Sequence, residues 1–522
     1  MSAPTRARRG AALRVLLAAF AVLAFATGLI AYQWYYGRRA HVTAAWNPAI
    51  QADADAQART SAEAARSVAD VPLEALTDQD ILFRVQGDAP GDYFGWSVAA
   101  LGDLDGDGIG DFAVGGHQLQ NSAERPNFDL PTGYVRVFSG ADARPLHTLR
   151  PEGSQHIDSS DDMFGVTVTG LDDLDGDGVD DLAVGAFLYD FEDPDQDEID
   201  ENTGAVQIHS GATGERLELL GGERWGDRFG FALDVMPDLD GDGKRELLVG
   251  VEKGETEDAV KNAGRTEIWS TGTLEPLTTA DGPGWEGRMG HSVAPLGDVD
   301  GDGVADFASG AYMFGARQEE DLQRGAVGVF SGASGELLRA FEGTAMLDNL
   351  GSAVRGLRGQ GEAQLVALGA TEAGYEAEFT GRYEGPGYVR IHDARTGALQ
   401  VRFTGAELGD QLGWALADAG DLDGGGADEL LIGAPAGMTF LEDKLDRPGR
   451  MYLIGGEDQR VLRAFRGLAD NDQFGAALAL LDDLDGDGVP EVLVGAPQNT
   501  AGQTEPGYAL VLRGSALMPA TR

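Results

Sequence analysis

Short segments in which apolar and polar residues alternate recur along most of the chain. The first, FGWSVAALGD, begins at residue 94 and is followed by an acidic stretch and then by an apolar run, DFAVGG. A third segment, GYVRVFSG, and a fourth, LHTLRPEG, complete the unit. Alternation with this period is typical of β-strands that bury one face. Each unit therefore predicts four short strands joined by glycine-rich turns.

An aromatic or aliphatic residue followed by glycine marks the start of each unit, and successive starts lie 60 to 70 residues apart. The seven starts are Phe94-Gly95, Phe164-Gly165, Phe229-Gly230, Met289-Gly290, Leu350-Gly351, Leu412-Gly413 and Phe474-Gly475. Repeated units of four strands are typical of propeller blades. The pattern predicts an all-β chain folded as a seven-bladed β-propeller.

The two ends of the repeat region predict how the ring closes. The seventh unit stops after its third strand, GYALVLRG, while an orphan strand, ILFRVQG at 81–87, precedes the first unit and resembles the missing fourth strand. Placed on the last blade, it would leave no open edge between the first and last blades. The alternative, an open solenoid, needs capping segments that we do not find in the sequence. We expect the propeller to span 80–515, followed by a tail at 516–522.

An acidic loop of the form D-x-D-x-D-G-x-x-D/E joins the first two strands in five of the units. The first, third, fifth and ninth carboxylates and the seventh carbonyl can surround one cation, and the glycine at position six permits the tight turn. Ligands that are all oxygen select a hard cation, and this number of protein ligands favours Ca²⁺ over Mg²⁺. The predicted ligands are Asp103, Asp105, Asp107, Ile109 and Asp111; Asp173, Asp175, Asp177, Val179 and Asp181; Asp238, Asp240, Asp242, Lys244 and Glu246; Asp298, Asp300, Asp302, Val304 and Asp306; and Asp483, Asp485, Asp487, Val489 and Glu491.

The remaining two units depart from this pattern. The sixth keeps Asp421, Asp423 and Glu429 but has Gly425 where an acid belongs, so we expect it to be empty or weak. The fifth has only LRGQGEAQ at 357–364 and is expected to bind no metal. The competing interpretation of all the loops, solvated Asp-Gly turns, is disfavoured because five copies share one phase with the strands.

Charge and composition limit the partners. The net charge of −48 argues against nucleic acid and against an anionic lipid surface, both of which need a basic face. Five Ca²⁺ ions neutralise only a small part of this charge, so most acidic residues are expected at the solvated surface. The chain has no cysteine and therefore no disulfide framework.

The N-terminal region differs from the rest. Basic residues in 1–14 precede an apolar run at 15–36 that is long enough to cross a bilayer and ends in an aromatic anchor, Trp34-Tyr35-Tyr36. The excess of positive charge before the run predicts a signal anchor with the large domain outside the cytoplasm, in the periplasm or at the cell surface. The alternative is a signal peptide cleaved after AFA at 24–26, giving a secreted protein. Residues 37–79 are expected to form a partly helical or flexible stalk.

The order Phe-Gly, acidic loop, Gly-Ala-Pro resembles the FG-GAP repeat of integrin α-subunit propellers. The last motif is complete at Gly433-Ala434-Pro435 and Gly495-Ala496-Pro497 and drifts elsewhere, for example to Gly185-Ala186-Phe187. This resemblance implies an adhesion or protein-interaction module rather than an enzyme, with calcium on one face and a protein or glycan partner on the other. Integrin leg domains and a C-terminal membrane helix are not recognisable, so pairing with a β-subunit is not carried over.

The loops between the second and third strands lie on the face opposite the acidic loops, and they are long and varied. Loops on a rigid scaffold are the usual place for binding. Their aromatic residues suit interface anchors, or else they fold back onto the blades; they are Tyr189, Phe191, Tyr312, Phe314, Tyr375, Phe379, Tyr383 and Phe440. Two other functions stay open: a carbohydrate-active or quinone-dependent propeller enzyme, by analogy of fold alone, and a purely structural surface scaffold.

Overall fold

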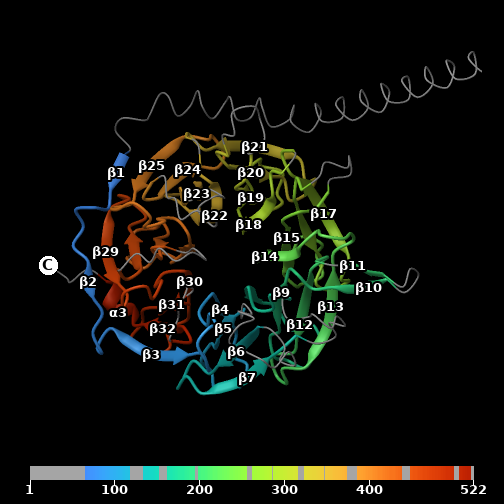
Figure 1. Ribbon diagram of the computed structural model, residues 1–522, viewed down its shortest axis with the longest axis horizontal. Coiled ribbons are helices and arrows are strands. Elements are labelled where there is room, and N and C mark those ends of the chain that lie inside the picture. Colours follow the sequence, from blue (N-terminus) through green and yellow to red (C-terminus); the bar gives the residue numbers. More distant parts are fainter. Residues whose placement is uncertain are drawn as a thin grey trace, which may run out of the picture.

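The computed structural model describes residues 65–117, 133–151, 162–193, 198–200, 202–255, 262–284, 286–315, 323–345, 347–361, 363–372, 385–437, 447–498 and 505–518. These residues form a ring of seven mainly antiparallel sheets, which confirms the predicted all-β, seven-bladed propeller (Figure 1). In each repeat unit the first strand lies near the centre of the ring, and the later strands follow toward the rim (Figure 1).

Blades 1 to 4 each consist of four consecutive strands of one unit. They are β4 (Ser97–Ala100), β5 (Phe112–Gly116), β6 (Tyr134–Phe138) and β7 (Pro145–Leu149); β8 (Thr167–Gly170), β9 (Leu182–Ala186), β12 (Ala205–His209) and β13 (Arg216–Gly221); β14 (Phe229–Met236), β15 (Glu246–Val251), β16 (Arg265–Trp269) and β17 (Pro276–Asp281); and β18 (Met289–Pro295), β19 (Phe307–Ala311), β20 (Ala326–Phe330) and β21 (Leu337–Glu342). A small hairpin of β10 (Phe191–Asp193) and β11 (Glu198–Asp200) is inserted between β9 and β12.

The last three blades each recruit a strand from the N-terminal side of the repeats. Their own strands are β22 (Leu350–Arg358), β23 (Gln364–Ala370), β24 (Tyr388–Asp393) and β25 (Leu399–Thr404); β26 (Leu416–Asp418), β27 (Leu430–Ala434), β28 (Arg450–Ile454) and β29 (Val461–Arg466); and β30 (Ala477–Leu480), β31 (Val492–Ala496) and β32 (Tyr508–Leu512). The strand expected at 81–87 is β3 (Ile81–Gln86), which pairs antiparallel with β32 and completes blade 7.

The segment 65–79, which we expected to belong to a stalk, instead lies along the rim. Its strand β1 (Ala65–Ser67) pairs in parallel with β25, and β2 (Glu74–Ala75) pairs in parallel with β29. Between them, Val68 is buried against the core shared by blades 5 and 6. The carboxylate of Glu74 accepts two hydrogen bonds from Arg463, at 2.8 and 2.7 Å. We call residues 65–80 the rim strap (blue in Figure 1).

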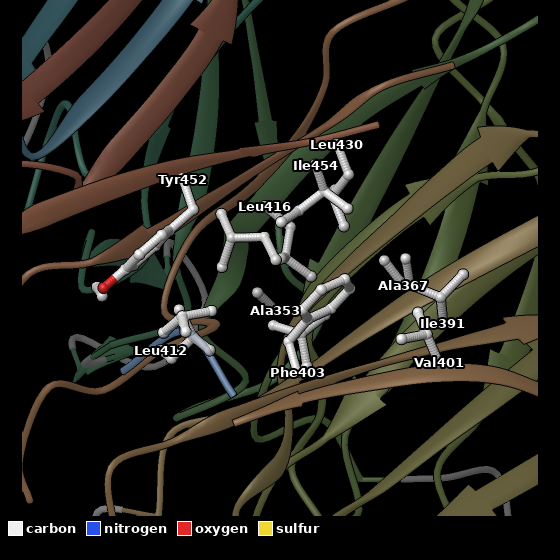
Figure 2. Close-up of a cluster of buried hydrophobic side chains, with 14 of the residues drawn as sticks. Ala353, Ala367, Ile391, Val401, Phe403, Leu412, Leu416, Leu430, Tyr452 and Ile454 are labelled. Carbon is white, nitrogen blue, oxygen red and sulfur yellow. The ribbon is translucent and has the colours of Figure 1, made fainter. Parts of the chain in front are cut away.

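The hydrophobic core lies between the blades rather than in the middle of the ring. Each of seven buried clusters joins two neighbouring sheets, and the cluster of blades 5 and 6 is shown in Figure 2, where Phe403 faces Leu416 across the interface. The C-terminal helix α3 (Gly514–Leu517), at the start of the expected tail, adds Leu517 to the cluster of blades 6 and 7. Successive side chains of a strand point to opposite faces of its sheet, so the burial of apolar side chains between neighbouring sheets explains the period of two in the sequence.

At each of the interfaces described next, the glycine of the Phe-Gly pair in one repeat meets the glycine that begins the Gly-Ala-Pro position in the preceding repeat. A Cβ atom on Gly495 of blade 7 would lie 2.0 Å from the carbonyl oxygen of Gly95 in blade 1, and Gly115 stands in the same relation to Gly165, at 2.3 Å. Gly95 also has φ of +96°, a conformation that favours glycine. The Phe-Gly and Gly-Ala-Pro positions are therefore glycine because neighbouring backbones touch there.

Candidate metal loops and the opposite face

The five predicted metal loops adopt one geometry, at the turn between the first and second strands of blades 1, 2, 3, 4 and 7. In the first loop, Gly106 and Gly108 have φ of +78° and +90°, which curls the backbone around Asp103. The carboxylate of Asp103 accepts hydrogen bonds from both of these amides, each at 2.8 Å. The same two bonds recur at the first acids of the other loops, Asp173, Asp238, Asp298 and Asp483.

The fifth and seventh positions of each loop are linked to one another. One carboxylate oxygen of Asp107 accepts a hydrogen bond of 2.9 Å from the amide of Ile109, which leaves its second oxygen available. The equivalent bonds run from Val179, Lys244, Val304 and Val489 to Asp177, Asp242, Asp302 and Asp487. This contact fixes the turn in which the carbonyl groups predicted as ligands lie.

The ninth acid of each loop is buried beneath it. Asp111 is 2% exposed, and its two oxygens accept hydrogen bonds from the amides of Leu104 and Gly140, at 2.8 and 2.9 Å. Burial, with a smaller contribution from the nearby Asp105 and Asp103 carboxylates, raises the pKa of Asp111 to about 6. The corresponding residues with raised pKa values and burial as the main cause are Asp181, Glu246, Asp306 and Glu491.

Each loop brings carboxylate oxygens within 4.8 Å of one another. The groups are Asp103, Asp105 and Asp111; Asp173, Asp175 and Asp181; Asp238, Asp240 and Glu246; Asp298, Asp300 and Asp302; and Asp483, Asp485, Asp487 and Glu491. Carboxylates this close repel one another unless a cation lies between them. Because the donors are oxygens and most are negatively charged, the residues fit a hard divalent cation such as Ca²⁺.

Two of the five loops also contact an arginine of their own blade. The guanidinium of Arg144 donates a hydrogen bond of 2.6 Å to Asp105, and Arg513 pairs in the same way with Asp485. Both acids hold the third position of their loops. In the intact loops of blades 2, 3 and 4, the described residues show no such arginine contact to the third acid.

The two departing loops differ in structure as well as in sequence. In blade 6, Glu429 is placed like the other ninth acids and accepts hydrogen bonds from Leu422 and Gly456, at 2.7 and 3.0 Å. In blade 5 the strands are longer and a tight turn replaces the loop, closed by a 2.8 Å bond from Gly359 to Ala363. The neighbouring Arg358 forms an ion pair with Asp428 of blade 6. In blade 5, an ion pair between side chains therefore lies where the other blades carry the acidic loop.

The opposite face carries the turns that enter the first strand and leave the second strand of each blade. The aromatic residues described there fold back onto the blades: Tyr189 is buried and contacts Phe191, Tyr312 is buried against the ring of His291, and Phe314 packs against the core of blades 3 and 4. The other aromatic candidates, Tyr375, Phe379, Tyr383 and Phe440, lie outside the described residues. Trp225, in the turn before blade 3, is 68% exposed on this face.

A charged group on this face was missed by the sequence analysis. Glu252, at the end of β15, is buried and pairs with Arg228 at 2.7 Å and with Arg288 at 3.5 Å. The repeat pattern does mark these positions. Each arginine directly precedes the Phe-Gly or Met-Gly pair of its unit, and Glu252 occupies the position of the proline in the Gly-Ala-Pro motif, which is Pro435 in blade 6 and Pro497 in blade 7. The three residues are too far apart in sequence to form a visible motif.

The comparisons with known proteins agree with this architecture. The family model of the FG-GAP repeat matches residues 289–330 and 474–512, which hold the first three strands of blades 4 and 7. Two of the seven blades thus contain recognisable FG-GAP repeats. The propeller resembles that of integrin α-subunits, and the predicted resemblance is confirmed.

Three integrin α-subunits illustrate how far the similarity of this chain extends. Integrin alpha-5 of Xenopus laevis is 29% identical over 235 residues, 42% of this chain and 20% of its own length. Integrin alpha-V of Gallus gallus is 27% identical over 245 residues, 44% of this chain and 22% of its length. Integrin alpha-PS2 of Drosophila melanogaster is 36% identical over 124 residues, 22% and 9% of the two chains. The matches thus span less than a quarter of the length of these relatives.

Among the residues that the structure describes, no helix combines the length and the apolar character needed to cross a membrane. The expected transmembrane span at 15–36, the preceding residues 1–14 and the first part of the expected stalk lie outside the described residues.

Proposed function

We propose that this protein is a calcium-binding propeller outside the cytoplasm that serves adhesion or protein interaction. An integrin-α-like propeller fits such a role at a general level. In more detail, we propose that the two faces of the ring have different roles. One face holds calcium in its acidic loops, and the other presents the turns and loops that contact a partner.

The calcium part of the proposal rests on one observation above all. Five loops repeat the same hydrogen bonds between the first acid and two glycine amides, and these bonds aim neighbouring carboxylates at a common point. Calcium bound only by the folded chain would stabilise it by mass action. We propose that Asp421, Asp423 and Glu429 in blade 6 form a weak or empty sixth site, because Gly425 supplies no carboxylate.

The location outside the cytoplasm rests on the N-terminal sequence. Residues 15–36 are proposed as an uncleaved signal anchor that leaves the propeller in the periplasm or at the cell surface; cleavage and secretion is the alternative. Millimolar calcium outside cells would keep even weak sites filled. The absence of cysteine fits this scheme, since metal rather than disulfides would then stabilise the ring.

The partner, a protein or a glycan, is proposed to bind the face opposite the calcium loops. Connections on this face are longer and more varied than the acidic turns, and Trp225 and Leu408 expose apolar side chains at equivalent positions of blades 3 and 6. A photo-crosslinking amino acid placed at Trp225 or Leu408 tests this directly. Matched positions on the other face are Asp142 and Glu215, in turns between third and fourth strands.

The full chain carrying each crosslinker is irradiated in its native membrane, and adducts are identified by mass spectrometry. We expect adducts with one recurrent partner from Trp225 and Leu408 and not from Asp142 or Glu215. The same partner crosslinked equally from both faces, or from the acidic face alone, contradicts the proposed binding face.

A further inference from the structure

A cluster of charged side chains lies close to the centre of the ring, on the face opposite the acidic loops. Glu252, 1% exposed at the end of β15, lies 2.7 Å from Arg228 at the start of blade 3 and 3.5 Å from Arg288 at the start of blade 4. His291, in β18, lies 3.5 Å from the same carboxylate. The first strands of these two blades, β14 and β18, line the middle of the ring (Figure 1).

Aromatic rings surround these charges. Tyr312 accepts a hydrogen bond of 3.0 Å from Arg288, and its ring lies 4.0 Å from that of His291. The guanidinium of Arg228 lies 5.4 Å from the ring of Phe187. Low-polarity neighbours strengthen electrostatic interactions by excluding water. The cluster is therefore partly shielded, although the side chains of Arg228 and Arg288 keep 24% and 13% of their surface exposed.

The positive charges outnumber the acids that face them. Lys253 follows Glu252 directly, and its ammonium lies within the electrostatic influence of both Arg228 and Arg288. Glu252 and Glu286 are the carboxylates that act on Lys253, and Glu286 is also held by Asn262 at 3.0 Å. Among the described residues, the Lys253 side chain makes no ion pair. Burial, with smaller contributions from the two guanidiniums, lowers the pKa of Lys253.

We propose that Arg228, Lys253 and Arg288, which we call the cationic cluster, bind a single carboxylate of a protein partner. The proposal rests on the proposed binding face and names the chemistry of its anchor. Glu252 fixes the two guanidiniums in place, while an incoming carboxylate supplies an ion-pair partner for Lys253, which has none among the described residues. A guanidinium can donate two parallel hydrogen bonds to a carboxylate, and an ammonium adds a point charge.

The charge of the whole chain indicates which kind of anion can reach the cluster. A polyanion such as an acidic polysaccharide must bring many of its charges within a Debye length, about 8 Å at physiological ionic strength, of a surface whose net charge is −48, and it is repelled there. One carboxylate on an otherwise neutral or basic protein surface experiences little of this repulsion. Once it is within a Debye length, the local cations dominate, so the structure favours an aspartate or glutamate side chain over a polysaccharide.

The test follows the acetylation of Lys253 in the full chain at fixed ionic strength, measured by mass spectrometry after brief exposure to an acetylating reagent. Three probes are compared: the peptide acetyl-Gly-Asp-Gly-amide, its Asn counterpart and polygalacturonate. We expect the Asp peptide to slow acetylation of Lys253 about twofold when its concentration equals its Kd. Lys244, in the third acidic loop of the opposite face, serves as the internal control and should react at an unchanged rate. Equal protection by the Asn peptide, protection by polygalacturonate alone, or no protection overturns the proposal.

A second measurement separates this anchor from the binding face itself. Crosslinking to the partner from Trp225 is repeated with Lys253→Gln, and Arg224→Gln, which removes an exposed charge of the same face, is the matched control. We expect Lys253→Gln to lower the adduct yield at least about threefold, the effect of losing a partly exposed charge pair, while Arg224→Gln leaves it unchanged. Unaltered adducts in Lys253→Gln overturn the anchor and leave the binding face standing. If the crosslinker at Trp225 gives no adducts in the chain that keeps Lys253, the binding face is overturned instead, regardless of whether the peptides protect Lys253 from acetylation.

Discussion

The phenol of Tyr508 donates a hydrogen bond of 2.6 Å to the buried carboxylate of Asp472, tying the third strand of blade 7 to the turn that enters it. The same pair joins Tyr134 to Asp92 and Tyr388 to Asp348. In blades 3 and 6 the tyrosine is replaced by arginine, in the pairs Arg265–Asp227 and Arg450–Asp410. In these five blades, the buried acid two residues before the Phe-Gly or Leu-Gly pair thus receives its partner from the same position of the third strand.

Removing the Tyr508 hydroxyl tests how much its hydrogen bond to Asp472 contributes to the free energy of unfolding. Tyr508→Phe should lower the free energy of unfolding by about 1–3 kcal/mol, because a buried carboxylate loses a donor. Urea denaturation of the calcium-saturated protein measures the effect. Tyr93→Phe removes a hydroxyl that makes no hydrogen bond among the described residues, and it should change stability by less than about 0.5 kcal/mol. Equal effects of the two substitutions contradict the role given to the pair.

The contact between repeat glycines predicts a steric effect at the point of ring closure. Gly495→Ala places a methyl group 2.0 Å from the backbone oxygen of Gly95, so blades 7 and 1 must separate. We expect a loss of about 1–3 kcal/mol, as for other overpacked interiors. Gly455→Ala is the control, because its Cβ would meet only side-chain atoms, at 3.2 Å or more. Thermal melting compares them, and a Gly495→Ala protein as stable as the control rejects the explanation.

The rim strap predicts that a residue far from the repeats in sequence stabilises blades 5 and 6. Val68→Ala should cost about 1–2 kcal/mol, the value of two buried methyl groups, and should speed hydrogen exchange of the amides in β1. Leu73, which is 37% exposed in the same segment, provides the control Leu73→Ala. If exchange in β1 is already as fast as in an unfolded peptide, the strap does not hold its place in solution.

The sequence predicts the repeated features of this protein well because each of them recurs in several units of the chain. Seven pairs of an aromatic or aliphatic residue with glycine, and the alternating segments that follow them, define the blades, and the orphan strand at 81–87 is recognisable from its likeness to other fourth strands. The rim strap was not predicted, because β1 and β2 have three and two residues and no alternation that could reveal them. The gathering of Arg228, Lys253 and Arg288 depends on contacts between residues that are distant in sequence, which no local pattern encodes.

A partly buried acid outside the metal loops predicts a pH dependence of stability. Burial, with a smaller contribution from Asp428, raises the pKa of Asp418 from 3.8 to about 6. Between these values the folded chain holds a proton that the unfolded chain has released, so raising the pH through this window lowers stability. Asp418→Asn should be more stable than the unmodified chain by about 1–3 kcal/mol at neutral pH and equal to it below the window. A difference that does not vary with pH disproves the raised pKa.

Calcium removal should weaken the whole ring. Each site filled at about 100 times its Kd contributes about 2.7 kcal/mol, so chelation should lower the Tm by about 5 °C or more. Differential scanning calorimetry with and without a chelator measures this change. Magnesium at the same concentration should restore less of the Tm than calcium does, because Mg²⁺ retains its waters. A Tm that is insensitive to chelator excludes a stabilising role for the loops.

The most direct test of the account is the number of calcium ions bound per chain, measured by equilibrium dialysis and atomic emission. The five intact loops predict about five ions. Asp238→Asn in the third loop should reduce the number by about one, whereas Asp421→Asn in the loop interrupted by Gly425 should leave it unchanged. A full-length chain that retains no calcium, or that loses as much with Asp421→Asn as with Asp238→Asn, contradicts the assignment of the acidic loops as calcium sites.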